Sequence, residues 1–312
     1  MNAHERCLLG IAMAAGGSLM WGLSGPASEY LFDRGVGVTW LIASKMLIAG
    51  VVLGFYCLIK DPHAFVAPWR SGKAIIHMLL FVVFGMVAMQ YVYFKAVSVS
   101  NAATATVLQY LSPVIILIWV AVSARMLPRR GDIITIIMAM VGTVLVVTKG
   151  QITTLAITPS ALFWGLATAV AAASYTIVPQ WLLANYSGVA ISAWSMLIGG
   201  LGMNLYQPSW THMPHMDLPM ILCYLFVVIF GTVFAYVLYL VSLVYISPTA
   251  AGLLDAFEPL GAVVCGVLFL HLRLSCWEVV GIAIILVTVA LMTLLEPRTP
   301  EPDETVGDIG RK

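Results

Sequence analysis

The segment GVTWLIASKMLIAGVVLGFYCLI, residues 37–59, determines the class of fold that this chain can adopt. Lys45 is its only charged side chain. A helix needs about 20 mainly apolar residues to cross the hydrocarbon core of a bilayer, which is about 30 Å thick. The segment is therefore long enough and apolar enough to be a transmembrane helix.

The composition extends this interpretation to the whole chain. Of its 312 residues, 61% are hydrophobic and only 9% are charged, whereas soluble domains are about 25% charged. A formal net charge of +1 offers no basic surface for nucleic acid. The five cysteines are scattered without metal-binding or redox spacing, so we expect neither a metal site nor a cofactor. These features indicate an integral membrane protein with no sizeable soluble domain.

Ten apolar segments are long enough to be transmembrane helices: 8–31, 37–59, 74–94, 101–123, 132–148, 158–183, 189–206, 218–243, 248–270 and 276–295. Their apolar runs are continuous and do not alternate with a period of two, which favours helices over a barrel. The first run is too long for a cleaved signal peptide and is interpreted as a retained helix. The proline-rich, charged residues 296–312 are expected to form a disordered cytoplasmic tail.

The distribution of lysine and arginine predicts how the chain is oriented. If the N-terminus is cytoplasmic, the inner segments carry Arg6, Lys60, Arg70, Lys73, Arg125, Arg129, Arg130, Arg298, Arg311 and Lys312. The outer segments carry only Arg34, Lys95, Lys149 and Arg273. Cytoplasmic loops are enriched in basic residues, so both termini are expected to lie in the cytoplasm, in a plasma or bacterial inner membrane.

Two proline-bearing segments point to an internal repeat. LQYLSP at 108–113 and LDAFEP at 254–259 are separated by 146 residues, and the same offset relates Gly85 to Gly231 and Tyr93 to Tyr239. The repeats are expected to be residues 8–148 and 158–295, with five spans each. An odd number of spans places the second repeat upside down in the membrane, as in many secondary transporters.

The layout resembles the EamA type of the drug/metabolite transporter superfamily over about residues 8–295. The resemblance rests on Met20-Trp21-Gly22, on Tyr93-Phe94-Lys95-Ala96, on 102–113 and on 247–259. It implies a ten-helix carrier of small metabolites, often amino acids or related compounds and frequently moved outward. The chain departs from the family pattern in two ways. Residues 125–128 and 271–274 lack an acidic residue that the family usually has, and Lys45 stands where arginine is common.

Ionisable side chains inside spans are functional candidates, because burying each costs roughly 2.5–3.5 kcal/mol on insertion scales. Four were singled out: Lys45, His77, Asp255 and Glu258. Glu258 lies about ten residues, or about 15 Å, into its span and shares a helix face with Asp255. These two carboxyl groups could take up a proton or a cationic group, with Lys45 as counter-charge. Alternatively, they form a structural ion pair. His77, near a helix end, is either interfacial or part of the site.

Other candidates are aromatic, polar or proline residues placed deep in the spans. The residues expected to line a substrate cavity are Trp21, Tyr91, Tyr93, Gln109, Ser112, Trp164, Tyr175, Tyr236 and Tyr239. Four prolines are expected to kink helices and free backbone carbonyls toward a cavity: Pro26, Pro113, Pro179 and Pro259. For both groups, ordinary helix packing is the alternative explanation.

These features together predict a secondary carrier working by alternating access around a cavity at the membrane midplane. Its partners would be a small-molecule substrate and the bilayer, and it would be a monomer or a weak homodimer. No hydrolase, metalloprotease or phosphate-loop motif occurs, so we expect no enzymatic activity. A membrane-embedded enzyme acting on a lipid or prenyl substrate remains an alternative, as does a passive channel.

Overall fold

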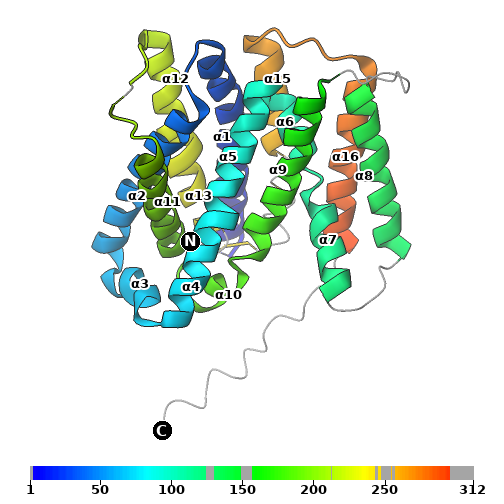
Figure 1. The fold of residues 1–312 in the computed structure, drawn as a ribbon. Helices are drawn as coiled ribbons and strands as arrows, with labels where there is room; N and C mark the ends of the chain where they lie inside the picture. Colours follow the sequence, from blue (N-terminus) through cyan, green and yellow to red (C-terminus); the bar gives the residue numbers. More distant parts are fainter. Residues whose placement is uncertain are drawn as a thin grey trace.

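The computed structural model describes residues 3–123, 130–148, 157–211, 213–242, 245–246, 254 and 257–295. Within these residues the regular structure is entirely helical, as the sequence predicts. The long helices run side by side as a bundle (Figure 1). Asp255 and the predicted tail, residues 296–312, lie outside the described part.

The described part of the N-terminal half is a succession of helices. These helices are α1 (Ala3–Asp33), α2 (Val38–Lys60), α3 (Pro62–Val66), the 3-10 turn η1 (Ala67–Arg70), α4 (Gly72–Leu80), the π-helix η2 (Phe81–Val87), α5 (Ala88–Val99), α6 (Ala102–Gln109), α7 (Ser112–Ser123) and α8 (Arg130–Thr148). The segments α4, η2 and α5 form one uninterrupted helix. Gly35, with φ of 85°, turns the chain between α1 and α2, in a conformation that glycine adopts without steric cost.

The described part of the C-terminal half is also a succession of helices. Its helices are α9 (Pro159–Ile177), α10 (Gln180–Asn185), α11 (Gly188–Tyr206), α12 (Leu218–Val228), the π-helix η3 (Ile229–Phe234), α13 (Ala235–Ser242), α15 (Phe257–Phe269) and α16 (Cys276–Leu295). Polar residues cap several helices. At α16, Ser275 and Glu278 form a reciprocal capping box, with N···O distances of 2.8 and 3.2 Å.

Within the described residues, six helical stretches are long and apolar enough to cross a membrane: Glu5–Asp33, Val38–Lys60, Gly72–Val99, Pro159–Asn185, Gly188–Tyr206 and Leu218–Tyr239. Their outward faces carry large apolar side chains. Phe55 and Phe163, for example, are 65% and 64% exposed. Such a surface is unfavourable in water but favourable against lipid, so the helices belong in a bilayer.

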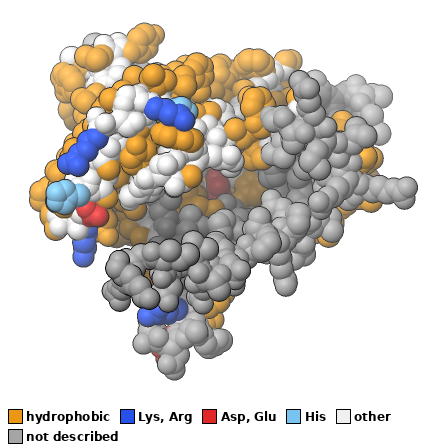
Figure 2. Space-filling model, turned by 90° about the horizontal axis from the view of Figure 1, so that it is seen from below, with side chains coloured by type: hydrophobic (Ala, Val, Ile, Leu, Met, Phe, Trp, Pro, Cys, Tyr) orange, Lys and Arg blue, Asp and Glu red, His pale blue; other side chains and the backbone are white. Residues whose placement is uncertain are grey.

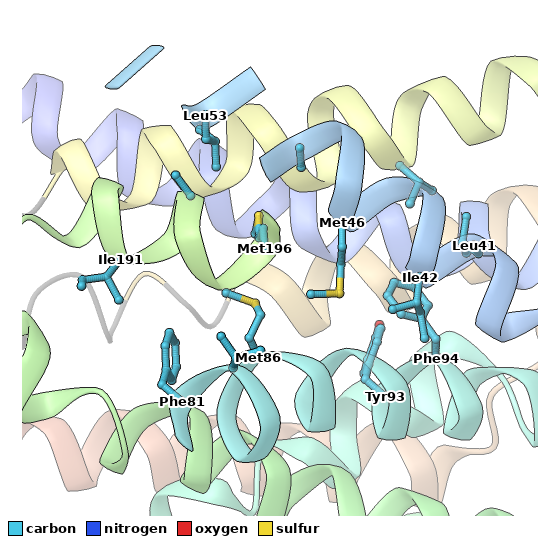
Figure 3. Close-up of a cluster of buried hydrophobic side chains, with 14 of the residues drawn as sticks. Leu41, Ile42, Met46, Leu53, Phe81, Met86, Tyr93, Phe94, Ile191 and Met196 are labelled. Atoms are coloured by element: carbon cyan, nitrogen blue, oxygen red, sulfur yellow. The ribbon is translucent and has the colours of Figure 1, made fainter. Parts of the chain in front are cut away.

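The interior is held together where small residues let helices approach closely. A Cβ atom at Gly200 would lie only 2.5 Å from the backbone nitrogen of Leu47, which joins α11 to α2. Beside this contact, Ile42, Met46 and Met86 point into the same apolar space between α2, α11 and η2 (Figure 3). Close approach at small residues is the usual way in which helices associate in membranes.

The two π-helical segments occupy equivalent places in the two halves. Gly85 lies in η2 and Gly231 lies in η3, and the sequence relates these two glycines by the 146-residue offset. Each segment ends with an i→i−5 hydrogen bond, from Ala88 to the carbonyl of Val83 and from Ala235 to that of Phe230. Because π-helices are rare and often functional, η2 and η3 mark their helices as candidates for a functional role.

Charged side chains gather at one end of the bundle. The connection between α2 and α4 carries Lys60, His63, Arg70 and Lys73, with Asp61 among them. Figure 2, which views the molecule from below, shows basic and histidine side chains on this face beside extensive apolar surface. This end therefore has the composition of a membrane–water boundary.

Candidate functional site

An aromatic cluster joins α1 of the first half to α13 of the second. The ring of Trp21 lies 5.1 Å from that of Tyr236, at 74°, and 5.2 Å from that of Tyr239, at 45°. These are the edge-to-face and tilted arrangements that aromatic pairs prefer. Three residues predicted from the sequence as cavity-lining are thus brought together across the boundary between the halves.

The cluster extends to α9 through Tyr175. The hydroxyl groups of Tyr236 and Tyr175 form a side-chain hydrogen bond. The ring of Tyr175 lies 5.6 Å from that of Phe81, at the start of η2. Buried tyrosines normally satisfy their hydroxyl groups in this way, and the connection links both π-bearing helices.

Glu258 enters this region from the first turn of α15. Its backbone packs against α1 at Gly22, where a Cβ atom would overlap the Glu258 carbonyl and lie 3.0 Å from its carbon. Its carboxyl group is within electrostatic range of the hydroxyls of Tyr93 and Tyr236. The glycine of the Met20-Trp21-Gly22 motif therefore has a specific structural role, which is to let α15 approach α1.

Tyr93 joins α5 to α6, and a neighbouring carboxylate joins α6 to α1. The hydroxyl of Tyr93 lies 3.1 Å from that of Thr106. One turn away on α6, the backbone N–H of Ala102 donates to Oε2 of Glu29 at 2.6 Å. Glu29 thus caps the N-terminus of α6 from another helix, where a negative charge is favourable. Glu29 is not among the candidate residues predicted from the sequence.

Lys45 is buried, with 3% of its surface exposed. Its ammonium donates a hydrogen bond to Oε1 of Gln90 at 2.8 Å and lies 4.0 Å from the centre of the Phe94 ring. The sequence predicted an acidic partner for Lys45. In the described part of the chain, its recorded contacts are instead a neutral amide and an aromatic face.

The fourth predicted span is discontinuous in the structure. Helix α6 ends at Gln109, turn residues follow at Tyr110 and Leu111, and α7 begins at Ser112, just before Pro113. Gln109 is 8% exposed, and its Oε1 atom has no hydrogen-bond partner among the described residues. A discontinuous helix at membrane depth can present its half-helix ends and freed backbone groups to a bound solute.

The other predicted residues occupy separate places. Tyr91 and Trp164 form their own pair between α5 and α9, with ring centroids 6.2 Å apart. Pro26 lies within α1, Pro179 lies at the junction of α9 and α10, and Pro259 is in the first turn of α15.

Two further features lie away from the aromatic cluster. The Nδ1–H of His77 donates to the backbone carbonyl of Lys73 on its own helix at 2.9 Å, and its ring contacts Trp181, with ring centroids 4.6 Å apart. A cavity of about 230 Å³ lies at the N-terminal ends of α6, α9 and α16, and none of the predicted cavity-lining residues lines it. Among the described residues, no group of three or more metal-ligating side chains occurs.

Comparison with known proteins gives consistent results. The sequence matches the EamA-like transporter family over residues 8–148 and 159–294. It is 33% identical over 296 residues to "Uncharacterized inner membrane transporter YicL" of Salmonella typhimurium, covering 94% of this chain and 97% of that protein. A solved crystal structure with 16% identity has the same fold, with a TM-score of 0.61 over 94% of this chain and 97% of the other. The chain belongs to the EamA-like transporter family and is a multi-pass membrane transporter rather than an enzyme.

Proposed function

We propose that this protein is a secondary transporter that exports small metabolites, such as amino acids or related compounds, by alternating access. Ten spans would form two inverted five-helix repeats, residues 8–148 and 158–295. The matching π-helices η2 and η3 support a duplicated architecture. The matched family segments, 8–148 and 159–294, divide the chain at the same place.

The observation that carries this proposal is the junction of the two halves around Trp21. Trp21 on α1 contacts Tyr236 and Tyr239 on α13, and α15 brings Glu258 against Gly22. A solute bound here would touch both halves, so a relative motion of the halves would change its access to each side of the membrane. We assign the cavity to the faces of α1, α5, α6, α9, α13 and α15.

Within this cavity we assign proton or cation coupling to Glu258, assisted by Asp255. A carboxyl group near the centre of the membrane is costly unless function requires it. The equivalent position in the first repeat is Ser112, so the repeat keeps a polar group at both places but a charge at only one. If the side chain at this position only packed against its neighbours, serine would suffice in both halves. Coupling of proton or cation movement to transport requires an ionisable group.

We further propose that both termini are cytoplasmic and that the protein works as a monomer or a weak homodimer. The basic connection between α2 and α4, with Lys60, Arg70 and Lys73, would then face the cytoplasm. The turn between α1 and α2, which carries Arg34, would lie on the opposite side.

Reconstitution into liposomes tests the proposed transport. Labelled amino acids, amines and sugars are offered with and without a pH gradient, to the wild type, to Glu258→Gln and to Glu5→Gln, in which the changed acid lies at the exposed start of α1. The wild type and Glu5→Gln should accumulate a solute when the gradient is present. Glu258→Gln should lose the accumulation while keeping the wild-type yield and melting temperature. Accumulation with unchanged pH dependence in Glu258→Gln would contradict the coupling role.

A further inference from the structure

The ammonium group of Lys45 is buried inside the bundle. Among the described residues, its contacts are with uncharged groups. Gln90 and Phe94, which hold the ammonium, are themselves buried, with 7% and 3% of their surfaces exposed. The edges of Phe94 pack against Tyr93 and Phe32, with ring centroids 5.1 and 6.1 Å apart. The ammonium is therefore fixed in position and is not free to reach the aqueous surface.

Among the residues that the structure describes, the contacts of Lys45 use only part of its hydrogen-bonding capacity. An ammonium group has three N–H donors and no acceptor. Gln90 accepts from one of them, and the face of Phe94 attracts the charge without neutralising it. A buried cation with a donor to spare is complementary to an anionic group, because charge-assisted hydrogen bonds are the strongest that a lysine can form.

A second unused polar atom lies at the same depth. The hydrogen bond between Tyr93 and Thr106 ties α5 to α6. Gln90 precedes Tyr93 by three residues and Gln109 follows Thr106 by three, so on these consecutive helices each glutamine Cα is displaced by about 4.5 Å along the axis, away from the turn that joins α5 to α6. Gln109 Oε1 has no donor among the described residues. In the described part of the chain, Lys45 thus offers a cationic donor and Gln109 a neutral acceptor that no other side chain there uses.

We propose that Lys45, positioned by Gln90 and Phe94, binds the carboxylate of the transported solute. Gln109 Oε1 accepts a hydrogen bond from a hydroxyl or amino group next to that carboxylate. The solute class is a small organic acid with a hydrogen-bond donor beside the acid group. This assignment rests on the proposed transport function and specifies which end of the solute the first half recognises.

A purely structural role for Lys45 predicts a different response to mutation. Methionine fills much of the space of the lysine stem without the charge, and it suits an interior that already contains Met46 and Met86. If the ammonium only held α2 against α5, Lys45→Met would lower the melting temperature. If the charge is kept for binding, Lys45→Met leaves the melting temperature of the ligand-free protein unchanged or raises it.

Thermal melting of the purified full chain tests the binding site with matched acids and amides. The probes are lactate and lactamide, L-threonine and L-threoninamide, and L-phenylalanine and L-phenylalaninamide. Lys73→Met is the control, because Lys73 also lies over an aromatic ring, 4.5 Å from the centre of Trp181, but is exposed. At least one acid should stabilise the wild type and Lys73→Met, while its amide does not. Lys45→Met should bind that acid roughly 10- to 100-fold more weakly, and Lys45→Arg should restore part of the affinity.

Three results would overturn the assignment: no acid stabilises the wild type, an amide stabilises it as well as its acid, or Lys45→Met binds the acid within about twofold of the wild type. Uptake of the labelled acid into liposomes separates this proposal from the transport proposal. If the acid binds in a way that depends on Lys45 but is not taken up, the binding site is supported and the transport proposal is refuted. If uptake is equal in the wild type and Lys45→Met, the transport proposal is supported and the binding site is refuted.

Discussion

Replacing Gly22 by alanine tests whether the junction of α1 and α15 holds the two halves together. The added methyl group would overlap the backbone carbonyl of Glu258, whose carbon would lie 3.0 Å away. Backbone cannot rotate aside as a side chain can, so α1 and α15 must separate by roughly 1 Å, which forfeits about a quarter to a half of the dispersion energy of nearby contacts. Overpacking of this kind typically costs about 1–3 kcal/mol.

Gly16→Ala on the same helix is the matched control, since a Cβ atom at Gly16 meets nothing within 4 Å. Melting is followed by tryptophan fluorescence in detergent. The chain contains nine tryptophans, and Trp21 lies beside the substitution. A loss of 1 kcal/mol corresponds to about 2–4 °C in a chain of 150–250 residues, so Gly22→Ala should melt several degrees below Gly16→Ala. Equal melting temperatures would refute the close approach of α1 and α15.

Two further predictions concern orientation and the cap on α6. In a cysteine-free background, Arg34→Cys should react with an impermeant thiol reagent added to intact cells and Lys73→Cys should not, because the connection between α2 and α4 is expected to be cytoplasmic. The reverse pattern would invert the topology. Glu29→Gln should destabilise the protein by about 1–2 kcal/mol, because it removes the negative charge at the N-terminus of α6. A melting temperature equal to that of Asp33→Asn, a change in the last turn of the same helix, would show that the cap contributes nothing.

The helices could be predicted from the sequence because each is a long apolar run bounded by charged or turn-forming residues. The run at 37–59 became α2, at Val38–Lys60, and the run at 189–206 became α11, at Gly188–Tyr206. The interruption of the fourth span could also be predicted from the sequence, because Pro113 has no backbone N–H to donate the hydrogen bond that would continue the helix. The π-helices were not predicted, since no known residue pattern distinguishes a π-helix from an α-helix.

The candidate site was only partly predictable. Trp21, Tyr236 and Tyr239 were identified because aromatic residues deep in spans are recognisable by position alone. The cap formed by Glu29 was missed because its partner is a backbone N–H group 73 residues away. The partner of Lys45 was expected to be acidic. Gln90 accepts its hydrogen bond instead, and because Gln90 carries no charge it is not among the ionisable candidates. Pairings between distant helices depend on packing that a single sequence does not reveal.

Helices α5 and α13 carry different side chains at positions that the 146-residue offset relates. The offset that relates Tyr93 to Tyr239 also relates Gln90 to Tyr236, since 90 + 146 = 236. In the first half these positions bind Lys45 and Thr106. In the second half both positions contact Trp21. Each pair lies on the α-helix that directly follows a π-helix. This difference would give the solute a polar contact in the first half and an aromatic contact in the second. An asymmetric molecule could then be held in one orientation throughout the transport cycle.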